Sequence, residues 1–156
     1  MTEIILVMVL LILFSISTLT LVATGSDSYI NIINDNEENS KLRVAQSYIH
    51  TKVRQNLEED AVYVANFSEI ETNCLVIKDG YSNIEYETVI FLHDGKMKES
   101  LIINGGSFNP EASFTIVEID KLDFNVINGN KLFFETSIFE NGQVKSLKSY
   151  ISLITK

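Results

Sequence analysis

An uncharged apolar run near the N-terminus constrains this chain more than any other feature. Residues Ile4–Ala23 contain no Asp, Glu, Lys, Arg, Pro or Gly over twenty positions. Because a helix rises about 1.5 Å per residue, a run of this length covers roughly 30 Å, the thickness of a bilayer's hydrocarbon core. The sequence therefore predicts that residues 1–25 form a transmembrane helix in contact with the lipid bilayer.

A cleaved signal peptide is the alternative explanation for this run. Signal peptides combine a basic first region with an apolar core of about 7–15 residues. No Lys or Arg precedes the run, although Ala23-Thr24-Gly25 offers small residues at cleavage-like spacing. We therefore expect a single-pass anchor in the cell membrane. The first basic residue after the run is Lys41, so the terminal amine is the only positive group close to either end of the run. Because positive groups favour the cytoplasmic side, we expect a cytoplasmic N-terminus and an extracytoplasmic C-terminal domain.

The charge of the chain argues against several classes of partner. The net charge is −9, and no cluster of Lys and Arg is present. Contact with nucleic acid or with anionic lipid as the main partner is therefore not expected. The single cysteine, Cys74, cannot form an intramolecular disulfide. It lies in an apolar stretch and is expected to pack as a small hydrophobe; an intermolecular bridge or a reactive thiol is the alternative.

Residues 26–60 are predicted to continue the helix, first as a polar segment and then as an amphipathic one. Several Asn residues and Gly25 weaken helical bonding in the polar part. From Ser40 to Asp60 apolar residues recur at helical spacing, at Leu42, Ala45, Ile49, Val53 and Leu57. Such a stripe predicts one face packed on a sheet.

Residues 61–156 are predicted to form an antiparallel β domain, because the apolar period changes from helical to alternating. Asx-Gly pairs typical of tight hairpins stand at Asp94-Gly95, Asn128-Gly129 and Asn141-Gly142. A further turn is expected over Asp79-Gly80 and Ser82-Asn83. The predicted fold class is α+β, with one long N-terminal helix, membrane-spanning in its first half, packed on an antiparallel β-meander.

This combination resembles a known group of proteins. An apolar N-terminal helix headed by Glu3, which continues as an amphipathic helix against an antiparallel sheet, is similar to type IV pilins and to the pseudopilins of type II secretion and competence systems. The stretches 42–49, 52–55, 87–99 and 108–112 resemble a narrower group of minor-pilin-like bacterial proteins, known as a domain of unknown function. The resemblance covers nearly the whole chain.

The resemblance implies a non-enzymatic subunit of a filament, with a pilin-like fold. It implies partners among other pilin-like subunits, met through the N-terminal helix, and an inner-membrane assembly platform. In pilins the acidic residue near the N-terminus is thought to meet the terminal amine of a neighbouring subunit, and Glu3 matches it. A buried carboxylate needs such a partner. Alternatively, Glu3 lies at the headgroup level and only caps the helix.

The N-terminus also departs from the usual prepilin pattern. Prepilins carry a short basic leader that ends in Gly, a first mature Phe and a Glu as fifth residue. Here the sequence starts at Met1 and its acid is third, which leaves peptidase cleavage open. In the outer half of the run, Ser15, Ser17, Thr18 and Thr20 are expected to support close helix packing in the membrane.

No catalytic, cofactor or metal site is predicted. The two histidines, His50 and His93, are expected on a solvated helix face and before a hairpin turn. A metal site at His93-Asp94 would need further His ligands that the chain lacks. The alternative to the filament subunit is a stand-alone, membrane-anchored extracytoplasmic binding module, with the Asn104–Ser113 loop as its ligand surface.

Overall fold

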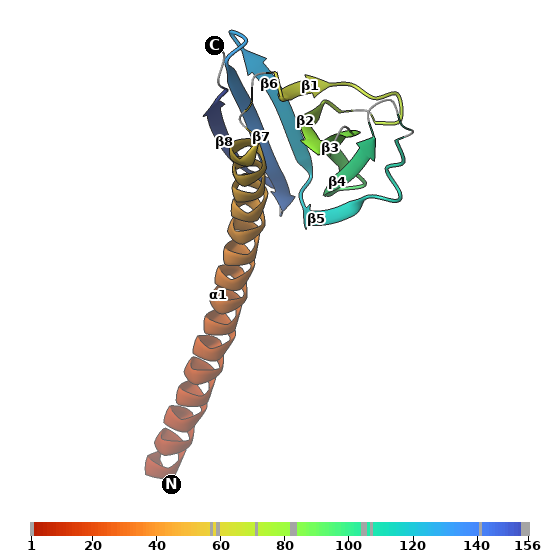
Figure 1. Ribbon diagram of the computed structural model, residues 1–156. Helices are drawn as coiled ribbons and strands as arrows, with labels where there is room; N and C mark the ends of the chain where they lie inside the picture. Colours follow the sequence, from red (N-terminus) through yellow and green to blue (C-terminus); the bar gives the residue numbers. More distant parts are fainter. Residues whose placement is uncertain are drawn as a thin grey trace. The chain divides into compact units, whose positions relative to one another are not determined.

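The computed structural model in Figure 1 describes residues 2–153 except 57, 59, 71, 82–83, 104–105, 107 and 141. The chain falls into two compact units, Met1–Asn39 and Ser40–Lys156. The first unit therefore joins the predicted transmembrane segment to the polar segment, and the second joins the amphipathic helix to the strands. We describe each unit by itself.

The helix α1 runs over Thr2–Gln55 and belongs to both units. It continues through the polar segment, as predicted, and ends five residues before the expected Asp60. Within the second unit its apolar stripe is buried: Leu42, Ala45, Ile49 and Val53 are each at most 1% exposed. The prediction of an amphipathic packing face is therefore confirmed, except that Leu57 lies outside the described residues.

Within the described part of the chain, eight antiparallel strands follow, and they confirm the α+β fold class. Their bounds are β1 Val62–Ala65, β2 Cys74–Tyr81, β3 Ile84–His93, β4 Lys96–Ile103, β5 Phe114–Glu118, β6 Lys121–Ile127, β7 Lys131–Glu140 and β8 Gln143–Ser152. They form a five-stranded sheet in the order β1-β2-β3-β4-β5 and a three-stranded sheet in the order β6-β7-β8. Each sheet is a meander, but the break between β5 and β6 was not predicted.

Tight turns set the register of the hairpins. Asp94 and Gly95 have φ angles of 51° and 66°, and Asn128 and Gly129 have 54° and 71°. Positive φ at both positions is the geometry that Asx-Gly pairs adopt readily, so these two predictions are confirmed. Gly142 also has a positive φ of 75°, while Asn141 lies outside the described residues.

One predicted turn is wrong. The Asp79-Gly80 pair does not turn, because β2 continues to Tyr81 in register with β3. Pairing along both strands holds the backbone of Asp79 and Gly80 extended, and this outweighs their local preference for a turn. Ser82 and Asn83, the other half of the predicted turn, lie outside the described residues.

The main core of the second unit lies between α1 and both sheets. The helix stripe packs in one cluster with residues of the five-stranded sheet, such as Leu75 and Ile90, and of the three-stranded sheet, such as Phe124 and Phe134. Figure 1 shows the last turns of α1 beside β7 and β8. The break after β5 therefore lets a single helix face contribute to a core shared by two sheets.

A second, smaller core covers the other face of the five-stranded sheet. Its buried members are Ile70, Cys74, Val76, Val89, Phe91 and Ile102. Phe67 and Phe108 pack on it from the connections before β2 and after β4, with ring centroids 4.9 Å apart. The five-stranded sheet is therefore apolar on both faces, and the segment that carries Phe108 is part of the cover.

Candidate functional site

The first candidate is the apolar segment of α1. Thr2–Ser26 has a mean hydropathy of 2.8, and none of its most apolar window is buried in the structure. Length and composition are sufficient for a membrane crossing. A helix this apolar is unfavourable in water without a cover. Its length and composition therefore support a single-pass membrane anchor.

The hydroxyl side chains predicted for helix packing lie within this segment. Ser15 donates to the Leu11 carbonyl at 2.8 Å, and Thr20 donates to the Ile16 carbonyl at 2.8 Å. Thr18 donates to carbonyls of the preceding turn in the same way. These bonds satisfy the hydroxyls inside their own helix, so the side chains can face lipid or another helix. Ser17 shares the same outer half of the segment.

Glu3 lies in the first turn of α1 and is exposed. A carboxylate at this end of a helix interacts favourably with the unsatisfied backbone N–H groups and with the helix dipole. This position fits both roles considered for Glu3, a cap at the headgroup level and a partner for an amine of another subunit.

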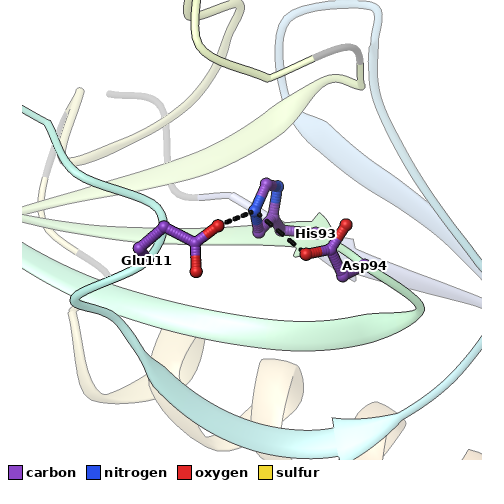
Figure 2. Close-up of side chains that lie close together, drawn as sticks. All are labelled: His93, Asp94 and Glu111. Carbon is purple, nitrogen blue, oxygen red and sulfur yellow. Dashed lines mark hydrogen bonds and ion pairs between the residues drawn. The ribbon is translucent and has the colours of Figure 1, made fainter.

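A second candidate lies in the β domain, where His93, Asp94 and Glu111 converge. Figure 2 shows both carboxylates directed at the same imidazole. His93 Nε2 is 3.2 Å from Glu111 Oε1 and 3.4 Å from Asp94 Oδ2. One ligand atom from each of the three residues lies within 4.8 Å of the other two. The cluster therefore has the composition and spacing of a small cation site.

Local structure positions the backbone of all three residues of this cluster. His93 is the last residue of β3, and Asp94 occupies the left-handed first position of the β3–β4 turn. Glu111 stands after β4, where its N–H donates to Asn109 Oδ1 at 3.0 Å. His93 is partly buried, at 24% side-chain exposure, while the Glu111 side chain is 76% exposed. The hydrogen bond from His93 is the main reason that the pKa of Glu111 is lowered.

The sequence reasoning identified His93-Asp94 as a pair and explained it by the hairpin turn. It missed Glu111, because Glu111 lies 18 positions after His93 in the sequence. Only the pairing of β3 with β4 and the return of the chain toward β5 bring the two together. The one signal in the sequence was the Asn109-Pro110 turn before Glu111.

The expectation that His50 lies on a solvated helix face is wrong. Its Nε2 lies 2.7 Å from Ser149 Oγ of β8, and its ring packs edge-on against Phe134 at 5.4 Å. Desolvation, together with the positive charge of Arg54, lowers the pKa of His50. The apolar spacing of the helix did not indicate these contacts, because the three-stranded sheet also contacts a polar position next to the buried stripe.

Cys74 is fully buried in the second core, as predicted for a small hydrophobe. Burial raises the pKa of its thiol to about 12. The thiolate, the reactive form, is therefore scarce at neutral pH. This argues against the alternative of a reactive thiol at Cys74.

Polar side chains also join α1 to the sheets. Lys52 Nζ lies 2.8 Å from Glu99 Oε1, and the Tyr48 hydroxyl donates to the other oxygen of the same carboxylate. Burial, and then the bond to Glu99, raise the pKa of Tyr48. Gln46 donates to Thr136 Oγ1 and to the Leu147 carbonyl. These bonds pair polar groups at the edge of the core and position α1.

A family model matches residues 40–138, more than half of the chain. The chain belongs to the DUF4860 family, a domain of unknown function. The DUF4860 match begins at the first residue of the second unit and includes His50, His93, Asp94 and Glu111. The apolar segment Thr2–Ser26 lies before it. No curated protein and no solved structure matches the chain.

Proposed function

We propose that the chain is a non-enzymatic structural subunit of pilin or pseudopilin type. In this proposal it joins a filament of a type IV pilus, a type II secretion system or a competence system through its N-terminal helix. The supporting observation is the apolar surface of Thr2–Ser26, none of whose most apolar window is buried, in a chain whose β domain buries its own helix stripe. Lipid covers this surface before assembly, and the apolar helices of other pilin-like subunits cover it afterwards.

The composition of the apolar segment is suited to helix packing. Ser15, Ser17, Thr18 and Thr20 are small, and the structure shows three of these hydroxyls bonded within their own helix. Small side chains let two helices approach closely in a membrane. Leu and Ile on the rest of the surface supply dispersion contacts with lipid or with a neighbour.

Glu3 sets the register of this packing in our proposal. A carboxylate surrounded by apolar helices is unfavourable unless it meets a positive group. The terminal amine of an adjacent subunit would provide that group, and would do so at one axial offset only. The N-terminus lies on the cytoplasmic side, where an inner-membrane assembly platform would add subunits, and the β domain lies outside.

Affinity purification of the full chain from the membranes and sheared surface filaments of its host tests this function. We expect other chains with apolar N-terminal segments to co-purify and to be identified by mass spectrometry. Glu3→Ala should reduce their recovery at least severalfold, because the register-setting charge is lost. The matched control Thr2→Ala, one residue away, should leave recovery unchanged.

Recovery of the chain alone from the membrane fraction would support the stand-alone binding module instead. Equal recovery for wild type and Glu3→Ala would remove Glu3 from the assembly role and leave it as a helix cap. One observation argues against the Asn104–Ser113 loop as the ligand surface of such a module. Phe108, in the loop expected to bind a ligand, packs on Phe91 and Phe67 as part of the domain's own cover.

A further inference from the structure

We infer that His93, Asp94 and Glu111 bind a divalent transition-metal ion of the Zn²⁺ class, and that this ion fastens the segment after β4 to the β3–β4 hairpin. The inference concerns a site that the proposed assembly function does not use. It rests on the convergence of three ligand-bearing side chains from two separate parts of the chain.

Two of the three distances within the cluster match those of a metal site, and the third pair, Asp94 and Glu111, lies within 4.8 Å. Zn²⁺ binds imidazole nitrogen at about 2.0–2.1 Å and carboxylate oxygen at about 2.0–2.2 Å, so the ligand atoms of a tetrahedral site stand about 3.3–3.5 Å apart. The observed separations from His93 Nε2 are 3.2 Å to Glu111 Oε1 and 3.4 Å to Asp94 Oδ2. An ion can therefore enter with small side-chain adjustments.

Without an ion the cluster is poorly matched. His93 Nε2 carries at most one proton, yet two carboxylates face it. A single N–H cannot make two good hydrogen bonds to oxygens on either side. A divalent cation in the same place would meet both carboxylates, and its charge would balance theirs. Lys98, the nearby cation, donates to the Pro110 carbonyl at 3.3 Å and thus also holds the segment that carries Glu111.

The ligand types select the class of metal. One imidazole nitrogen with two carboxylate oxygens suits Zn²⁺ and neighbouring transition ions. Ca²⁺ and Mg²⁺ prefer sites made of oxygen alone. Three protein ligands leave a fourth tetrahedral position for water, and the high exposure of Asp94 and Glu111 keeps that side open.

Space for a bound water exists beside the cluster. An open hollow there is lined by Glu69, Thr72, His93 and Asp94, among others. The Thr72 hydroxyl oxygen is buried and has no hydrogen-bond partner among the described residues. The hollow therefore brings one more carboxylate, that of Glu69, to the side of the cluster formed by His93 and Asp94.

The position of the site gives the ion a structural role. Glu111 lies three residues after Phe108, which packs edge-on against Phe91 of the second core at 5.0 Å. An ion that joins Glu111 to His93 therefore holds the Phe108 cover against the five-stranded sheet. Metal binding that orders a segment in this way contributes its binding free energy to folding.

Calorimetric titration of the full chain in detergent, without a polyhistidine tag and after treatment with a chelator, tests the site. We expect ZnCl₂ to bind with a stoichiometry of one, CaCl₂ and MgCl₂ not to bind, and Co²⁺ to give the enhanced visible absorption of a four-coordinate site. Zn²⁺ should also raise the thermal midpoint by several degrees and slow hydrogen exchange of residues 108–113.

Variants locate the ion. His93→Gln and Glu111→Gln should each weaken Zn²⁺ binding at least tenfold, and Glu111→Gln changes an exposed side chain without disturbing the core. The matched controls are His50→Gln, the only other histidine, and Glu58→Gln, an exposed carboxylate elsewhere. The absence of Zn²⁺ binding by the wild type overturns the inference, as does binding that survives both His93→Gln and Glu111→Gln.

Discussion

The two halves of α1 have similar backbones and opposite surfaces. In the segment Thr2–Ser26 apolar side chains surround the helix, and all of them are exposed. In the part from Ser40 to Gln55 apolar residues form one stripe, which is buried against two sheets. One half therefore depends on lipid or other chains for its solvation, while the other half is covered by the chain itself.

This difference separates the unit that holds a folded core from the unit whose apolar surface the chain itself leaves uncovered. The second unit has a core, polar bonds such as Gln46 to Thr136, and the α+β fold needed to hold its helix. The first unit has an unbroken helix whose hydroxyls are satisfied internally. Changes in the first unit should therefore alter location and association, while changes in the second should alter the free energy of unfolding.

The largest expected effect comes from charges at the centre of the apolar segment. Each Arg at the middle of a membrane helix costs about 2.5–3.5 kcal/mol, so Leu13→Arg with Ile16→Arg should cost roughly 5–7 kcal/mol of insertion free energy. We expect the double variant to leave the membrane fraction in cell fractionation. The control pair Val44→Arg with Thr51→Arg, at exposed positions of the same helix in the second unit, should stay membrane-bound.

Membrane retention of the Leu13→Arg, Ile16→Arg protein would contradict the anchor. If both double variants leave the membrane fraction, the distinction between the two halves of the helix is wrong. The distinction is supported if only the Val44→Arg, Thr51→Arg protein stays in the membrane fraction and circular dichroism shows that the β domain of both proteins is folded.

The next largest effect is on the free energy of unfolding, and it comes from replacing one Phe by Ala in each of the two regions. Phe134 is fully buried and contacts His50, while Phe14 is 68% exposed in the apolar segment. Phe134→Ala should lower the free energy of unfolding by about 3–5 kcal/mol, because it removes a buried ring and leaves a cavity. Phe14→Ala should leave it unchanged. Urea unfolding of the full chain in detergent, followed by near-ultraviolet circular dichroism, measures both.

An equal loss of stability in the two variants would show that the exposed segment supports the fold of the second unit. A negligible loss in Phe134→Ala would contradict the core described above. Either result would remove the physical basis for treating the two units as separate.

Strong local patterns in the sequence predicted much of the fold. The stripe from Leu42 to Val53 and the Asx-Gly turns at Asp94 and Asn128 depend on nearest neighbours, so both could be identified from residue spacing. Asp79-Gly80 failed because pairing with β3 overrides a local turn preference. The division into two sheets depends on how one helix face is shared, which no single segment encodes.

The candidate sites divide in the same way. The apolar segment and Glu3 could be identified because composition alone marks them. The His93 cluster and the His50–Ser149 pair could not, since each joins residues that are far apart in sequence. Histidine beside a turn or on a helix has an ordinary explanation until the fold brings a partner to it. Only three-dimensional contacts distinguish the two cases.

The smallest expected effect is a pH dependence that arises in the second unit alone. The pKa of His50 is lowered by desolvation and by Arg54, so the folded protein holds this ring neutral at pH values where the unfolded chain begins to protonate it. As the pH falls below about 6.5, the unfolded state binds more protons, and the free energy of unfolding falls. The slope from one proton cannot exceed about 1.4 kcal/mol per pH unit.

His50→Gln should remove this slope, because Gln keeps a hydrogen-bonding group near Ser149 Oγ and does not titrate. Urea unfolding of both proteins at pH 7.5 and 5.5 gives the comparison, and carboxylates common to both cancel in the difference. A smaller loss of stability on acidification in the variant is the expected result. If both proteins lose the same free energy of unfolding between pH 7.5 and 5.5, His50 is solvated after all. The side of α1 that faces β8 would then resemble the exposed half of the helix more than its buried stripe.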